Sequence, residues 1–96
     1  MTNRHWPEAV DSQVAEARRA LLILHHTAEA AGTDMGEVLA FGREGWPPGT
    51  ADAYDVFQEA RMRLTVALAR ADGKDFDRLS AREAAPYLLT AMALAL

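Results

Sequence analysis

Residues 10–31 read VDSQVAEARRALLILHHTAEAA, and residues 53–71 read AYDVFQEARMRLTVALARA. In both stretches apolar side chains recur at alternating steps of four and three, which places them along one side of a helix. A strand repeats every two residues and does not produce this series. The two stretches therefore predict two helices that pack side by side. The positions in the series are Val10, Val14, Ala17, Leu21, Leu24, Ala28 and Ala31, then Ala53, Phe57, Ala60, Leu64, Ala67 and Ala71.

The first helix has recognisable ends, and a short helix is expected after it. Pro7 suits the first helical position, because the N–H that it lacks would be unpaired there, and Gly32 ends the helix. Asp34 and Glu37 then have the spacing of a capping pair, which predicts a second helix over residues 35–44. The apolar residues of that helix are Val38, Leu39 and Phe41.

Residues 45–50, GWPPGT, predict a loop, because two consecutive prolines prevent a helix from continuing. The third helix follows this loop, with Thr50 or Asp52 expected as its cap. Gly73 is expected to end it.

Ser80 and Glu83 have the spacing of a capping box, so a fourth helix is expected to begin at Ala81. Pro86 removes one backbone hydrogen bond and crowds the carbonyl four residues earlier, which predicts a kink or a break. The chain has 96 residues, half of them apolar, enough for one small core but not for two. The expected fold is all-α: a small four-helix bundle-like domain over residues 1–96, with a short second helix.

Composition excludes several classes of protein. The chain has no cysteine, which removes disulfides and thiolate metal sites and fits the reducing cytoplasm. Its first twelve residues contain no apolar segment typical of a secretory signal. The longest apolar run, over residues 86–96, is shorter than the roughly 20 residues that span a bilayer. We therefore expect a cytoplasmic protein without a membrane partner.

The apolar surface exceeds what one small core can bury. Leu21, Leu22, Ile23 and Leu24 surround one turn of the first helix, and residues 86–96 are almost uniformly apolar. The surplus predicts a protein partner, most economically a second copy of the chain, since symmetric dimers are the commonest oligomers. The alternative is a monomer with the first helix in its centre. The candidate interface residues are Leu22, Ile23, Leu88, Leu89, Met92, Leu96 and, if its side chain is exposed, Trp46.

DNA binding is the runner-up hypothesis. Arginines at positions 18, 19, 61, 63 and 70 could form a basic face. A net charge of −4 argues against it, because phosphate contacts supply most of the non-specific affinity for nucleic acids. Asp52 and Asp55 also stand at the start of the third helix, where a recognition helix contacts bases. Nucleic acid is therefore an unlikely partner.

A third hypothesis is a bundle that binds a metal or a small molecule. His25 and Glu29 share one side of the first helix and could supply two metal ligands, but a structural zinc site needs four. No nucleophile and base are paired in the sequence, and no pattern indicates a cofactor or an enzyme. The favoured expectation is a small non-enzymatic adaptor or regulatory protein that dimerises.

Overall fold

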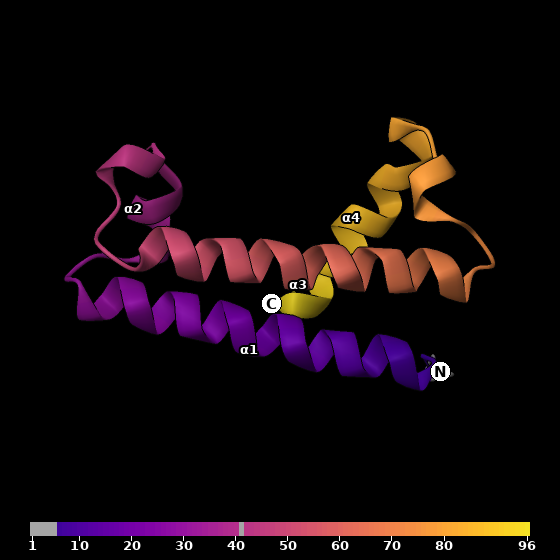
Figure 1. Ribbon diagram of the computed structural model, residues 1–96, viewed down its shortest axis with the longest axis horizontal. Helices are drawn as coiled ribbons and strands as arrows, with labels where there is room; N and C mark the ends of the chain where they lie inside the picture. The colour runs from indigo at the N-terminus through magenta and orange to yellow at the C-terminus, as the bar shows by residue number, and fades with distance from the viewer. Residues whose placement is uncertain (1–5, 41) are drawn as a thin grey trace.

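Two long antiparallel helices, α1 (Glu8–Ala30) and α3 (Thr50–Ala71), form the frame of the molecule (Figure 1). In this computed structural model, residues 6–40 and 42–96 are described. Two further helices complete the fold, the short α2 (Met35–Ala40) and α4 (Ala81–Ala95). No strand is present among the described residues, so the predicted all-α class is confirmed.

The seam between α1 and α3 follows the predicted apolar series. Ala17, Leu24 and Ala28 of α1 are buried, as are Ala60 and Leu64 of α3. The last member of each series is exposed. Ala31 follows the last residue of α1, and Ala71 is the last residue of α3. Leu24, Leu64 and Leu68 are among the largest wholly buried side chains, and they belong to the core cluster that α1 and α3 share with α4.

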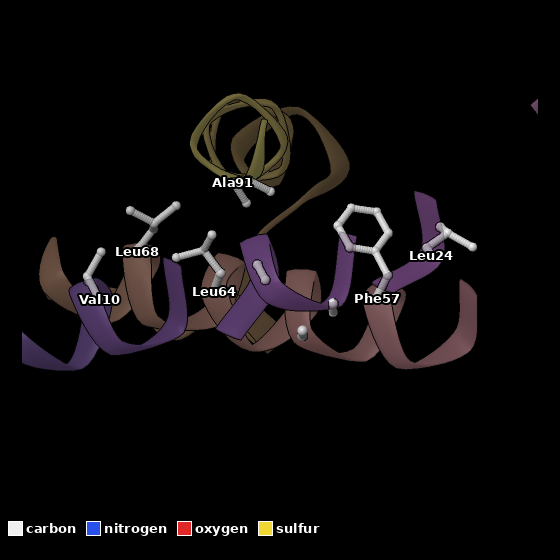
Figure 2. Packing of buried hydrophobic residues seen from close by; sticks show 10 residues of the cluster. Val10, Leu24, Phe57, Leu64, Leu68 and Ala91 are labelled. Carbon is white, nitrogen blue, oxygen red and sulfur yellow. The ribbon is translucent and has the colours of Figure 1, made fainter. Parts of the chain in front are cut away.

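α4 crosses the face of the α1 and α3 pair, and Tyr87, Met92 and Leu94 pack half-buried against the core beside its buried alanines. Its buried residues are Ala84, Ala91 and Ala95. Figure 2 shows Ala91 pointing from α4 toward the layer that contains Val10 and Leu64. The larger side chains of α4 lie on its flanks and outer side, where Leu89 is 72% exposed.

Two glycines end the long helices in the same way. Gly32 and Gly73 have positive φ angles of 81° and 76°, which an L side chain rarely adopts. The N–H of Gly32 donates to the carbonyl of Glu29, and the next N–H donates to the carbonyl of Ala28. The same pair of bonds follows α3, so both predicted helix ends are Schellman motifs.

The second helix is shorter than predicted. α2 ends at Ala40 instead of residue 44, and a 3₁₀ turn occupies Arg43–Gly45. Gly42 lies between these two elements, and its carbonyl accepts from the N–H of Gly45. Glycine disfavours a continuous helix because it loses the most backbone entropy. The predicted cap is present, since Asp34 Oδ1 accepts from the N–H of Glu37 at 2.8 Å. Phe41, expected in this helix, lies outside the described residues.

The start of α3 differs from the prediction that Thr50 or Asp52 would cap it. Gly49 is the cap residue, with φ 84° and ψ −20°, and Thr50 is the first helical residue and is buried. The carbonyl of Pro47 accepts from the N–H of Thr50 at 3.2 Å. Proline at the second position and glycine with positive φ at the third define a type II turn. The turn sets the direction of the helix, so no side-chain cap is needed.

α4 begins as predicted and continues past Pro86. Ser80 Oγ accepts from the N–H of Glu83, and the Glu83 carboxylate accepts from the N–H of Ser80. These bonds to Ser80 lower the pKa of Glu83. Of the kink or break expected at Pro86, the break is absent, because α4 is one helix over Ala81–Ala95. Pro86 leaves only the carbonyl of Arg82, one turn earlier, without its helical donor. Both residues are exposed, so water can replace that bond.

Ala60→Leu is expected to lower the free energy of unfolding by about 1–3 kcal/mol, because Ala60 is 1% exposed and extra methylenes would overpack the seam. Ala67→Leu is the matched control and should cost less. Ala67 is half-buried and borders an open depression that can accept a larger side chain. Urea denaturation of the two variants compares them directly. Equal losses of unfolding free energy in the two variants would show that packing around Ala60 is no tighter than around Ala67.

Candidate binding groove between α1, α3 and α4

An open groove of about 570 Å³ lies where α4 ends over the α1 and α3 pair. Its size falls within the range of small-molecule sites, which are also mainly apolar with a few polar groups. The groove is lined by Arg18, Leu21, Leu22, Leu24 and His25 of α1, by Tyr54, Phe57, Gln58 and Arg61 of α3, and by Met92, Ala95 and Leu96. We call this surface the α4 groove.

Helical spacing explains why these residues meet. Tyr54, Phe57, Gln58 and Arg61 stand at steps of three, one and three, so they share one side of α3. α4 covers the same face further along and stops at Ala95. The groove is therefore the part of the face that α4 leaves uncovered. Figure 1 shows that the C-terminus lies near the middle of the α1 and α3 pair.

The end of the groove near α2 is held by a chain of polar and aromatic contacts. Gln58 Nε2 donates to the Tyr54 hydroxyl at 2.6 Å. The Tyr54 ring packs edge-on against Trp46, with ring centroids 5.0 Å apart. Trp46 Nε1 in turn donates to the carbonyl of Val38 at 2.6 Å. Trp46 therefore holds the Tyr54 ring in place at this end of the groove.

The groove has a positive lining in an acidic protein. It contains Arg18 and Arg61 and no aspartate or glutamate, although the chain carries a net charge of −4. Arg18 Nε donates to the carbonyl of Leu94 at 2.8 Å, which satisfies one of the carbonyls that the end of α4 leaves free. Arg61 Nε is buried without a hydrogen-bond partner, and so is Gln58 Oε1.

Three of the predicted interface residues meet at the groove: Leu22, Met92 and Leu96. Leu88 is half-buried and Leu89 is exposed one turn earlier on α4. Ile23, 52% exposed, lies outside the groove lining, since one residue turns the helix by about 100° from Leu22. Trp46 was a candidate interface residue only if its side chain was exposed. The side chain is half-buried and hydrogen-bonded, so Trp46 is not such a candidate.

Sequence reasoning did not find the polar part of the groove. Arg18 and Arg61 were predicted only as part of a basic face, and no position in a groove was predicted for Tyr54 or Gln58. The available signal was the spacing of Tyr54, Gln58 and Arg61, which places all three on one flank of the apolar seam. These residues line a groove only because α4 lies beside them.

Comparison with protein family models, with curated proteins and with solved structures gives no match.

Ionisable groups with perturbed pKa values lie outside the groove. The Tyr87 hydroxyl donates to Asp72 Oδ2 at 2.8 Å, and this bond raises the pKa of Tyr87. The bond ties α4 to the end of α3. Like the bonds between Glu83 and Ser80, this bond stabilises an end of a helix.

A metal centre has no support among residues 6–40 and 42–96. His25 Nε2 lies 2.7 Å from Glu29 Oε1, as their spacing predicts. However, no group of three or more histidine, aspartate or glutamate side chains in this part of the chain could hold a metal ion. A search of the same residues finds no helix with the length and hydropathy needed to cross a membrane.

Proposed function

We propose that the protein is a small non-enzymatic interaction protein, an adaptor or regulatory subunit, that forms a homodimer through α4. The supporting observation is the orientation of this helix. Ala84, Ala91 and Ala95 are buried against the α1 and α3 pair, whereas Leu89 and Leu96 are 72% and 83% exposed. Exposed apolar side chains that share one side of a helix are typical of an interface.

The spacing along α4 favours a partner helix. Ala85, Leu89, Met92 and Leu96 follow one another at steps of four, three and four, which is the seam of two paired helices. Leu22 of α1 widens this surface, because it lines the groove together with Met92 and Leu96. A second α4 packed on the first would bury both seams.

The charge pattern favours a second copy over a different partner. The charged residues of α4 are Arg82 and Glu83, both in its first turn. The seam beyond them has no charged side chain. It therefore gives no preference for a different protein whose helix carries the opposite charge. A two-fold axis brings identical surfaces together, and an uncharged leucine seam can face itself without repulsion.

Leu89→Glu is expected to separate the dimer, because a carboxylate buried in an apolar interface without a counter-charge is costly. Light scattering should give a mass of about twice 10.5 kDa for the unmodified protein and 10.5 kDa for the variant, with the helical circular dichroism preserved. Val56→Glu is the matched control, since Val56 is 54% exposed on α3 and belongs neither to the seam of α4 nor to the groove lining. A mass of 10.5 kDa for the unmodified protein at all concentrations would refute the proposal.

The alternative of DNA binding loses support from the placement of the arginines. Arg18 and Arg61 line the α4 groove, whereas Arg63 and Arg70 line a separate depression that also contains Glu59. Arg61 and Arg63 are about 200° apart around α3, so they cannot contact one phosphate backbone together. The cytoplasmic location stays a proposal that rests on the absence of cysteine.

A further inference from the structure

The floor of the α4 groove contains a buried cationic donor that the fold does not use. Arg61 Nε is buried and has no acceptor in the structure, in contrast to Arg18, whose Nε donates to a carbonyl of α4. A buried donor that belongs to a charged group is costly when it is unpaired. Within the chain a free acceptor is Gln58 Oε1, three residues earlier on α3, and a ligand in the groove is the other source of an acceptor.

Gln58 provides a second buried position next to Arg61. The two residues are three apart on α3, so their side chains are neighbours on the helix surface. Gln58 Nε2 now donates to the Tyr54 hydroxyl, and Oε1 is buried without a partner. Rotation of the amide by half a turn lets the Tyr54 hydroxyl donate to Oε1 and brings Nε2 into the buried position. Arg61 and Gln58 can then both donate to one acceptor.

The remainder of the groove is apolar. Phe57 and Leu24 are buried side chains of the core that also line the groove, and Leu21 and Met92 are half-buried beside them. A ligand with an anionic end and an apolar body matches both parts. The side chains that line the groove include two arginines and no aspartate or glutamate, so their charge is complementary to an anion.

We propose that the α4 groove binds an amphiphilic carboxylate such as a medium-chain fatty acid, with its carboxylate on Arg61 and Gln58 and its chain on Phe57 and Met92. A carboxylate fits better than a neutral head group because a guanidinium forms its strongest hydrogen bonds with an ionised acceptor. The volume of about 570 Å³ lies in the range of sites for ligands of this size. The inference does not require the dimer.

Isothermal titration calorimetry of the full chain with decanoate tests the proposal. Decanol is the matched probe, because it has the same chain without a charge. At neutral pH, where decanoate is ionised, we expect one decanoate to bind per chain. The affinity for decanol should be about ten- to a hundredfold lower, the loss that corresponds to a hydrogen bond with a charged group.

Three variants of α3 locate the site. Arg61→Gln should reduce the affinity for decanoate to that for decanol. Gln58→Glu places a carboxylate within the chain beside Arg61, so it should abolish decanoate binding while preserving or raising the urea midpoint. Arg63→Gln is the control on the other side of the helix and should leave the affinity unchanged. The urea midpoint of each variant shows that it is folded.

The proposal is overturned if decanoate does not bind, if decanol binds equally well, or if Arg61→Gln and Arg63→Gln have the same effect. Leu89→Glu separates this proposal from the dimer. If the Leu89→Glu variant has a mass of 10.5 kDa and still binds decanoate, the ligand site is intact although the dimer is lost. Absence of decanoate binding by this monomeric variant, in which no second copy covers Met92 and Leu96, refutes the site.

Discussion

Leu64→Ala is expected to lower the free energy of unfolding by about 2–5 kcal/mol, since it leaves a cavity in addition to the loss of buried methyl groups. Leu64 is 0% exposed and lies in the middle of the core cluster, between residues of α1 and α4 (Figure 2). In a domain of this size each kcal/mol shifts the melting temperature by roughly 4–8 °C. The loss is a large fraction of the roughly 5–15 kcal/mol that stabilises a typical domain.

Met62→Ala is the matched control, because Met62 lies two residues earlier on the same helix and is 42% exposed. It should change the free energy by less than about 0.5 kcal/mol. Urea denaturation at one fixed protein concentration measures both variants, since the stability of a dimer depends on concentration. A loss at Leu64 no larger than that at Met62 would contradict the placement of the core.

Pro86→Ala is expected to have the opposite sign and to stabilise the protein by about 1–3 kcal/mol. Alanine restores the N–H that can donate to the carbonyl of Arg82 and removes the clash of the proline ring with that carbonyl. The gain is reduced by about 0.4–1 kcal/mol, because proline also restricts the unfolded chain.

Pro48→Ala separates these two contributions. Pro48 occupies the second position of the type II turn before α3, where its fixed φ angle is suitable and no helical bond can be gained. This variant should therefore lose about 0.4–1 kcal/mol. Thermal denaturation of the pair should show a rise in melting temperature for Pro86→Ala and a fall for Pro48→Ala. A fall for both would mean that Pro86 is part of the packing of α4.

The sequence predicts those features that depend on neighbouring residues. The seam of α1 and α3 follows from the spacing of residues such as Ala17 and Leu64, and the start of α4 follows from Ser80 and Glu83. These features depend on helical geometry and on hydrogen bonds between residues three or four positions apart. The start of α3 was predicted less well, because a turn at Gly49 and a cap at Thr50 both agree with the residues in that loop.

The groove could not be predicted because it depends on how far α4 extends over the other helices. Periodicity indicates which residues of α4 share a side, but it does not give the angle at which the helix crosses α1 and α3. The same limit explains why Leu22 was predicted together with Ile23, although only Leu22 lines the groove. Arg61 and Gln58 acquire a possible role only when Met92 and Leu96 are placed opposite them.

The alanine contacts of α4 also have a consequence for dynamics. The buried residues of α4 are only Ala84, Ala91 and Ala95, and its larger contact residues Tyr87, Met92 and Leu94 are half-buried. Its detachment therefore exposes less apolar area, and costs less, than unfolding the α1 and α3 pair. The molecule should therefore open in two steps, with the amides of α4 exchanging with solvent faster than those around Leu24 and Leu64. A partner that covers the outer leucines of α4 would slow this opening. The amide exchange rate of α4 would then measure the fraction of the protein that is bound to the partner.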